Sequence, residues 1–401
     1  MNRIYPYRNN SHKSQFSQRY GFTALLFFLM FSLFKPAGVE EISYLLPLNY
    51  LLTMGQFLLV PVTIWLYKDR KINLFIVVLL TLVVVLLFFS FLEGSIVFNT
   101  RLFNWLKILF GCLLLEACMK SNRIVFFFRA VFASCVLILL INLIFTFLIN
   151  PGGMYSNFLE DLRGICFYGD KNSVRNPALL GFMAACALDY YAGCRAPLRS
   201  LFALFLGVFS VGMVGSATSF VALCVLSVAY LFVVLRNKIL DIRLVGILIA
   251  AFWAMVVFVR KLPGVEQFVV GVLQRDMTFS GRTIIWDQVL ANLSSNIFYG
   301  HGLNVQIPVG WNVGYVTHCH NAYLDITYRA GIIGLILFIA LIVLSLRSVY
   351  YFISCNIAKS FALVLLAFLF VGIFGSLDNP FFFMVLGLCY NIREIIQNYE
   401  Q

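Results

Sequence analysis

Long apolar runs separated by short polar turns dominate the chain. About twelve of these runs approach the ~20 residues that an α-helix needs to cross the hydrocarbon core of a bilayer. They lie near residues 21–34, 43–67, 72–92, 102–118, 124–149, 177–194, 200–214, 220–235, 244–259, 331–349, 358–375 and 380–392. The pattern therefore predicts an all-α polytopic membrane protein with about 12 transmembrane helices, nine of them within residues 21–259 and three within 331–392.

Composition and charge support this prediction and orient it. The chain has 401 residues, of which 62% are hydrophobic and 11% charged, and this composition excludes an ordinary soluble domain. The net charge of +12 is interpreted as Lys and Arg that hold loops on the cytoplasmic side, and not as a surface for nucleic acid. The positive loops alternate consistently if both tails, 1–20 and 393–401, are cytoplasmic. No cleavage motif follows residues 21–34, so this run is predicted to be a retained helix and not a signal peptide.

Two outer segments are longer than simple turns. They cover residues 150–176 and 260–330, the second lying between the ninth and tenth predicted spans. Both contain Arg and Lys, which reverses the charge rule locally and calls for an explanation other than topology. The sequence therefore predicts that any chemistry takes place in these loops, on the periplasmic face of the inner membrane.

Three of the four histidines cluster in the second outer segment: His301, His318 and His320. A neutral imidazole is a suitable general base near neutral pH, since its ordinary pKa is about 6.5. A metal site is the less favoured interpretation, because the loop has few carboxylates and no C-x-x-C or H-E-x-x-H pattern. Histidines that merely face water or lipid headgroups are the simplest alternative.

A short amphipathic helix is predicted after Ser280-Gly281-Arg282-Thr283, because apolar residues recur at helical spacing from Ile285 to Ile297. This helix is expected to lie in the membrane interface. Arg282 would stand at its N-terminus, where free N–H groups, the helix dipole and the guanidinium favour a phosphate. Lys171 and Arg163, in the first outer segment, add cations on the same side of the membrane. An arginine that only reaches headgroups, and a solvated turn around Lys171, are the alternatives.

Cys166 and Cys319 are the two cysteines in the outer segments. An oxidising compartment would permit a disulfide between them, but sequence spacing alone does not decide whether they pair.

Four segments in order carry a family resemblance: Ser280–Trp286, Tyr299-Gly300-His301-Gly302, His318-Cys319-His320-Asn321-Ala322-Tyr323-Leu324 and Gly331–Leu335. Over about residues 160–340 the chain resembles the O-antigen ligase and polysaccharide polymerase superfamily of bacterial membrane glycosyltransferases. The resemblance implies a GT-C-like fold, no cofactor and no metal. It implies a glycan donor carried on undecaprenyl pyrophosphate, and membrane lipids as surroundings.

The resemblance also implies roles for particular residues. His320 becomes the catalytic base and Asn321 its neighbour in the motif, while Arg282, helped by Lys171 or Arg163, binds the carrier pyrophosphate. His318, His301, Asp325 and Arg329 are candidates for acceptor binding or support. Independent chemical reasoning agrees, because inverting glycosyl transfer needs a base for the acceptor hydroxyl, and fixed cations can replace a metal at the leaving group.

The turn Gly215-Ser216-Ala217-Thr218-Ser219 departs from the ligase pattern, which has an arginine after a serine there. This departure favours a polymerase, which joins lipid-linked repeat units and works with a chain-length regulator. The close alternative is an O-antigen ligase, whose acceptor is lipid A-core. A transporter of lipid-linked sugars and a non-catalytic subunit are alternatives of other classes, but the two halves of the chain show no similarity that a transporter would favour.

Overall fold

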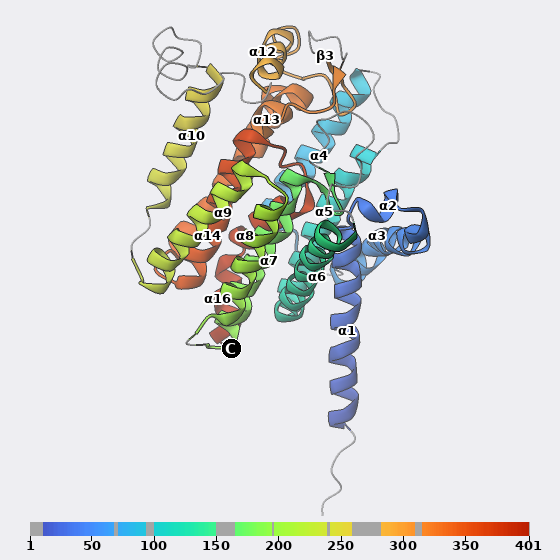
Figure 1. Cartoon of the computed structure of the whole chain (residues 1–401), viewed down its shortest axis with the longest axis vertical. Helices are drawn as coiled ribbons and strands as arrows, with labels where there is room; N and C mark the ends of the chain where they lie inside the picture. Colours follow the sequence, from blue (N-terminus) through green and yellow to red (C-terminus); the bar gives the residue numbers. More distant parts are fainter. Residues whose placement is uncertain are drawn as a thin grey trace, which may run out of the picture.

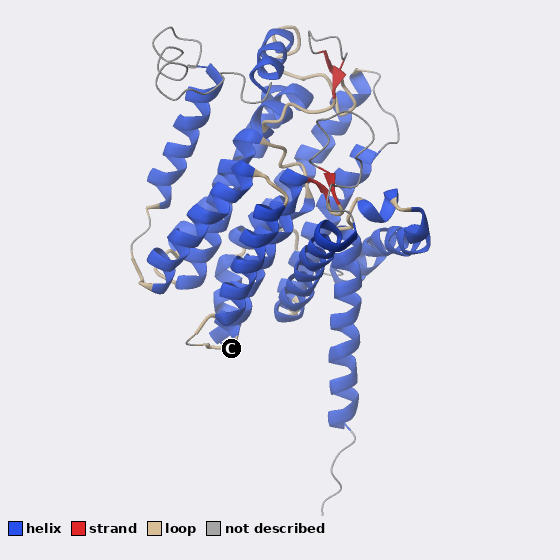
Figure 2. Ribbon diagram, viewed as in Figure 1, coloured by secondary structure: helices blue, strands red, loops and turns tan. Residues whose placement is uncertain are grey.

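The protein is a bundle of helices with two small pairs of antiparallel strands (Figures 1 and 2). The structure is a computed structural model, and it describes residues 11–67, 71–93, 100–149, 165–194, 196–238, 241–258, 282–308 and 315–400. Strand β1 (Ile165–Cys166) pairs with β2 (Gly169–Asp170), and β3 (Ile307–Pro308) pairs with β4 (Tyr315–Val316). The predicted all-α class is confirmed.

The helices follow the predicted apolar runs closely. They are α1 (Ser11–Leu33), α2 (Gly38–Glu41), α3 (Leu46–Tyr67), α4 (Leu74–Leu92), α5 (Thr100–Lys120), α6 (Ile124–Ile144), α7 (Arg175–Tyr191), α8 (Leu198–Met213), α9 (Ala217–Ala229), α10 (Ile242–Phe258), α12 (Arg282–Leu293), α13 (Ala322–Tyr351), α14 (Asn356–Val371), α15 (Pro380–Tyr390) and α16 (Ile392–Glu400). Single 3₁₀ or π turns extend several of them: η1 (Ser43–Leu45), η2 (Phe145–Ile149), η3 (Lys171–Val174), η4 (Tyr230–Leu235) and η6 (Gly372–Phe374).

Seven helical segments in the described ranges are long and apolar enough to cross a membrane: Ser43–Tyr67, Leu74–Leu92, Arg101–Lys120, Ile124–Leu148, Ala217–Leu235, Ala322–Tyr351 and Asn356–Phe374. Shorter apolar helices cover Gly21–Leu33, Leu198–Met213, Ile242–Phe258 and Pro380–Tyr390. The polytopic character is therefore confirmed, whereas twelve crossings and the cytoplasmic termini stay predictions.

Two carboxylates inside the bundle, those of Glu116 and Asp189, have polar partners. The Glu116 carboxylate accepts a hydrogen bond from the Tyr67 hydroxyl at 2.9 Å and forms an ion pair with Lys120. The Asp189 carboxylate accepts from both the backbone N–H and the hydroxyl of Ser200, at 2.9 and 2.6 Å. These pairings offset the cost of removing a carboxylate from water.

Two of the three hydrophobic clusters among the described residues lie beside the outer loops. The main cluster surrounds α7 and α15, most of whose residues are buried. A second cluster joins α10, α12 and the start of α13 through Val256, Trp286, Val289, Ile307 and Tyr328. Figure 1 shows α12 and β3 at the same end of the bundle as the start of α13. The apolar face of α12, which the sequence assigned to the membrane interface, thus packs against protein.

Helix α13 begins within the second outer segment, before the tenth predicted span. Its first residue is Ala322, and it bends at Gly331, where the predicted span begins and where φ of 62° and ψ of −165° are not helical. The extra helical turns contain Asp325 and Arg329, which are buried as an ion pair at 2.7 Å and so do not interrupt the helix as isolated charges would.

The bend at Gly331 packs directly against Gly300. A Cβ atom on Gly331 would lie 2.1 Å from the Phe298 carbonyl oxygen, and one on Gly300 would lie 2.6 Å from the Arg329 carbonyl carbon. The Ile332 N–H donates to the Ile297 carbonyl at 2.9 Å across the same contact. Two glycine motifs of the sequence therefore fit together backbone to backbone.

We expect Gly331→Ala to destabilise the protein by more than about 2 kcal/mol, because it combines a strained backbone conformation with a clash against main-chain atoms. Thermal unfolding of the purified protein in detergent measures the effect. Gly246→Ala is the matched control, since a Cβ at Gly246 meets no atom within 4 Å. Equal melting temperatures for the two variants would contradict the tight contact.

Candidate active site

His318 and His320 form a pair at the start of α13. Their ring centroids are 4.0 Å apart, with an angle of 53° between the ring planes. His320 has a φ of 50°, a left-handed conformation that ends the loop and begins the helix at Asn321. Cys319 between them is fully buried, whereas both imidazoles are half-buried. The loop therefore turns its thiol into the core and leaves its two imidazoles near one another.

The buried Asp325–Arg329 ion pair and the Trp286 indole hold the backbone of Cys319 between the two histidines. The Asp325 carboxylate accepts from the Cys319 N–H at 2.9 Å and from Arg329 Nε at 2.7 Å. The Trp286 indole N–H of α12 donates to the Cys319 carbonyl at 2.9 Å. Both polar groups of the Cys319 backbone are thus satisfied by side chains, which holds the flanking histidines in place.

Arg101 and Arg329 hold two outer-loop segments together. Each guanidinium donates to the carbonyls of both Leu303 and Thr317. The bond to the Thr317 carbonyl is 2.6 Å long from Arg101 and 2.7 Å long from Arg329. Arg329 and Asp325, which the sequence offered as candidates for acceptor binding or support, both form hydrogen bonds to backbone groups of the loop. Arg101 was not predicted, because a single arginine at a helix start carries no distinctive pattern.

Asn321 is the N-cap of α13. Its side-chain oxygen accepts from the N–H groups of Tyr323 and Leu324 at 3.1 Å and from the Trp253 indole N–H at 3.3 Å. Within the described part of the chain, its buried amide nitrogen has no hydrogen-bond partner. Asn321 thus fixes the helix start next to His320 and joins it to α10.

The pKa values of both imidazoles are lowered. Burial is the largest cause for each, and the neighbouring His318 and Arg282 lower the pKa of His320 further, to about 4. His320 is therefore neutral at pH 7 and able to accept a proton. Arg282 is the first residue of α12, as predicted, and its electrostatic effect on His320 places its charge near the imidazole.

Arg175, the first residue of α7, brings a second guanidinium to the same region. It is 4% exposed, and its Nη1 and Nη2 atoms lie 3.5 Å from the Ser219 hydroxyl and 3.4 Å from the Ser376 carbonyl. Gly375 permits the approach, because a Cβ there would lie 2.5 Å from Arg175 Nη2. Among the described residues no carboxylate forms an ion pair with Arg175, and its Nε has no partner.

The turn that follows α8 connects this arginine to the first outer segment. The Ser216 hydroxyl lies 2.8 Å from the Ser219 hydroxyl and donates to the Asn172 side-chain oxygen at 2.7 Å. The turn Gly215–Ser219 contains no arginine, but its Ser219 hydroxyl contacts the guanidinium of Arg175 from α7. Asp170 and Arg282 both act electrostatically on Arg175, so the charges of the two outer segments meet here.

A comparison with known families supplies the context for this geometry. Residues 202–339 match the family model described as O-antigen ligase. The chain carries an O-antigen ligase domain. This match supports the predicted resemblance to the O-antigen ligase and polymerase superfamily. A search of curated proteins finds no match to the chain.

The O-antigen ligase domain contains most of the site but not all of it. Arg282, the two histidines, Asn321 and the bend at Gly331 lie inside the matched residues. Arg175 and Lys171 come from the segment before it, and Arg101 comes from α5. Together with the apolar helices, the O-antigen ligase domain indicates a bacterial inner-membrane protein.

The remaining predicted residues lie apart from the histidine pair or outside the described ranges. His301 Nε2 is 3.3 Å from the Asn292 carbonyl, and the ring packs on Tyr328 at 4.6 Å, so His301 supports the loop of the O-antigen ligase domain. Lys171 begins η3, directly before α7, and is half-buried. Arg163 lies outside the described residues.

The disulfide that the sequence left open is not formed, since Cys166 and Cys319 are both free thiols. They pack in different hydrophobic clusters, Cys166 in the main core and Cys319 in the cluster around α12. Among the described residues, no three His, Cys, Asp or Glu side chains are grouped so as to hold a metal ion. The charged groups that act on the histidine pair are the guanidiniums of Arg101, Arg282 and Arg329 and the carboxylates of Asp170 and Asp325.

Proposed function

We propose that this protein is a membrane glycosyltransferase that uses a glycan linked to undecaprenyl pyrophosphate as donor. Its product is a surface polysaccharide, made on the outer face of the inner membrane by joining lipid-linked repeat units. The observation that carries the proposal is that Arg282, the first residue of α12, acts electrostatically on both Arg175 of α7 and His320 at the start of α13. The O-antigen ligase match over residues 202–339 supports the same class of reaction.

The two arginines fit the leaving group. Arg175 is buried without a carboxylate partner among the described residues, and a buried unpaired guanidinium is costly unless an anion joins it. Arg282 stands at the N-terminus of α12, where the helix dipole also favours an anion. A pyrophosphate bound by both would satisfy these charges, and fixed arginines would take the role that a metal plays elsewhere.

His320 fits the acceptor side of the reaction. In the proposed step the neutral imidazole takes the proton of an acceptor hydroxyl, whose oxygen attacks the anomeric carbon from the face opposite the pyrophosphate. The bond between the anomeric carbon and the pyrophosphate oxygen breaks, and its electron pair leaves with the pyrophosphate. Configuration at the anomeric carbon is inverted. His318 and Asn321 position the imidazole, and Lys171 or Arg163 would help Arg282 to bind the carrier pyrophosphate.

The acceptor is the second point of the proposal. The turn around Lys171 and the arginine-free turn Gly215–Ser219 favour a polymerase, with another lipid-linked repeat unit as acceptor and a chain-length regulator as partner. An O-antigen ligase is the second candidate, since the matched family carries that description and Arg175 supplies a guanidinium to this very turn. A ligase would use lipid A-core as acceptor.

Gel electrophoresis of surface polysaccharide from a deletion strain distinguishes the two. Loss of a polymerase leaves single repeat units attached to core, and a plasmid copy of the wild-type gene restores the ladder. Loss of a ligase instead leaves polymer of full length on the lipid carrier without transfer to core. An unchanged polysaccharide in the deletion strain would contradict both candidates.

A further inference from the structure

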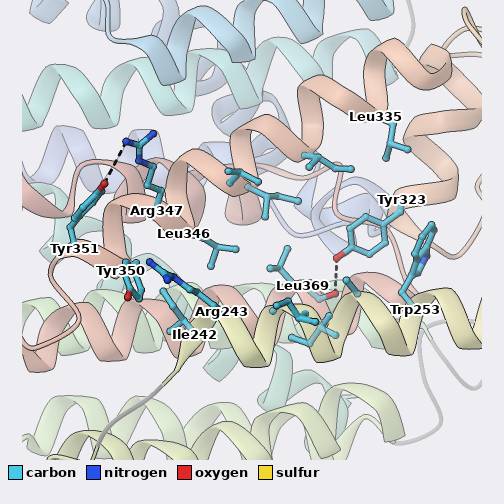
Figure 3. Close-up of a pocket in the computed structure, with 17 residues that line it drawn as sticks. Ile242, Arg243, Trp253, Tyr323, Leu335, Leu346, Arg347, Tyr350, Tyr351 and Leu369 are labelled. Carbon is cyan, nitrogen blue, oxygen red and sulfur yellow. Dashed lines mark hydrogen bonds between the residues drawn. The ribbon is translucent and has the colours of Figure 1, made fainter.

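An apolar groove of about 800 Å³ separates α10 from α13 (Figure 3). Aliphatic side chains line most of it, among them Ile247, Leu335, Ile339, Val343 and Leu346. Ile247, Ile339 and Val343 are also substantially exposed, so the groove opens sideways, between the two helices, to whatever surrounds the bundle. For two membrane helices those surroundings are lipid.

The two ends of the groove differ in chemistry. At one end Arg243 stacks over the Tyr350 ring at 3.7 Å, and Arg347 donates to the Tyr351 hydroxyl at 3.4 Å. At the other end the groove reaches Trp253 and Tyr323, as Figure 3 shows. The groove therefore has a cationic, aromatic end and a long apolar body.

The two guanidiniums are available for an external anion. Among the described residues no carboxylate lies within ion-pair distance of Arg243 or Arg347. Asp241, close in the chain, uses its carboxylate oxygen to accept from the N–H groups of Arg243 and Leu244 and so caps α10. Two guanidiniums on facing helices can hold one phosphate between them, with charge-assisted hydrogen bonds from both sides.

The length of the groove indicates which lipid fits. Arg243 and Trp253 are about 15 Å apart along α10 at 1.5 Å per residue, about half of the ~30 Å hydrocarbon core. Such a groove matches the acyl chains of a phospholipid from one leaflet. A lipid whose pyrophosphate is bound near Arg282 would instead present its tail to the opposite end, far from both arginines of the groove.

Helix α10 is fully buried only near its two ends. Its buried residues are Ile242 at one end and Val256 and Val257 at the other, so its middle faces the groove. The Trp253 indole N–H donates to the Asn321 side-chain oxygen, which connects the far end of the groove to the histidine loop. An occupant would therefore hold α10 against α13 beneath the candidate site.

We propose that this groove binds an anionic phospholipid, with its headgroup phosphate between Arg243 and Arg347 and its acyl chains along α10 and α13. The lipid is a bound structural partner and not a substrate. The proposal does not rest on the glycosyltransferase activity, because Arg243 and Arg347 lie at the end of the groove away from Trp253 and the histidine loop.

Native mass spectrometry of the full-length protein in detergent tests the site. The probes are phosphatidylglycerol, which is anionic, and phosphatidylcholine with the same acyl chains. We expect phosphatidylglycerol to be retained about ten-fold better, since two charge-assisted contacts select its headgroup. The double variant Arg243→Gln, Arg347→Gln should lose this preference.

Two further variants separate the site from general effects of charge or folding. Arg236→Gln is the matched control, because Arg236 is an exposed arginine that stacks on Phe232 and does not line the groove. It should keep the preference. Gly246→Phe should abolish phosphatidylglycerol binding with both arginines present, since the new ring enters open space in the groove.

Three results would overturn the proposal. One is equal retention of the two phospholipids by the wild type, and another is a preference that survives in the double Gln variant. The third is displacement of phosphatidylglycerol by undecaprenyl phosphate in a manner that depends on Gly246 but not on the arginines. That result would assign the groove to an isoprenoid chain.

Discussion

Replacement of His320 by alanine should lower the rate of glycan transfer by about 10²- to 10⁴-fold, because the acceptor hydroxyl would lose its general base. The rate is measured as chain extension from purified lipid-linked repeat units by the protein in detergent or vesicles. In cells, the variant should fail to restore the polysaccharide ladder of the deletion strain. Its melting temperature should stay close to that of the wild type, since His320 is half-buried and lies at a loop end.

The pH profile tests the role of His320 as a base more directly. Its pKa is lowered to about 4, so the imidazole is neutral at pH 7 and becomes protonated only as the pH falls through that value. The kcat/KM of glycan transfer should therefore persist at pH 5.5 and fall at lower pH. A histidine of ordinary pKa would already lose its base form near pH 6.5. The profile of His320→Ala should lack this acid limb.

His301→Ala provides the matched comparison. It removes an imidazole from the same outer region, but one that contacts the Asn292 carbonyl and the Tyr328 ring. It should lower stability more than His320→Ala and leave the shape of the pH profile unchanged. If His301→Ala abolishes transfer while His320→Ala remains active at equal expression, the assignment of the base is wrong.

Replacement of Arg175 by alanine should weaken binding of the carrier diphosphate and lower transfer by about 10²- to 10³-fold, the size of effect seen when one fixed charge-stabilising donor is removed. The decisive readout is selectivity between two ligands of the same chain, undecaprenyl pyrophosphate and undecaprenyl phosphate. Wild type should prefer the diphosphate, and Arg175→Ala should reduce that preference by about ten-fold. Arg175→Lys should retain part of it, because the charge remains but the paired N–H groups do not.

A purely structural role for Arg175 predicts a different pattern, in which both ligands are weakened equally and the melting temperature falls. Arg199→Ala, at the start of the next helix α8, is the control. Its guanidinium is 48% exposed and lies 3.7 Å from Asp189, so its loss should change neither ligand preference nor transfer.

Much of the architecture follows from local sequence. In lipid, the backbone N–H and C=O groups of an apolar run of spanning length must form hydrogen bonds within the run, and a helix provides these bonds. The helices therefore coincide with the apolar runs. Arg282 was located correctly at a helix start, because the apolar period begins directly after it. His318, His320 and Asn321 were found because polar residues with chemistry stand out in a chain with so few of them.

Other features depend on contacts between distant segments and could not be predicted. Arg175 meets Ser219 and Ser376, which are far from it in the chain, so no local spacing signals the cluster. Its position at the edge of an apolar run was the one available signal, because an arginine there must find a polar neighbour. The helical turns of α13 before Gly331 were not predicted for a related reason, since Asp325 and Arg329 are polar in sequence but neutralise each other inside the protein.

The sequence by itself determined the membrane class, the helices and the superfamily, because hydrophobic length and motif order are properties of the chain alone. Only the tertiary structure decided which side chains meet. It brought Arg175 to the turn that lacks an arginine, packed α12 on protein through Trp286, and left a groove between α10 and α13. The physical reason is that charge pairing, close glycine contacts and cavities arise between segments, where sequence distance carries no information about spatial distance.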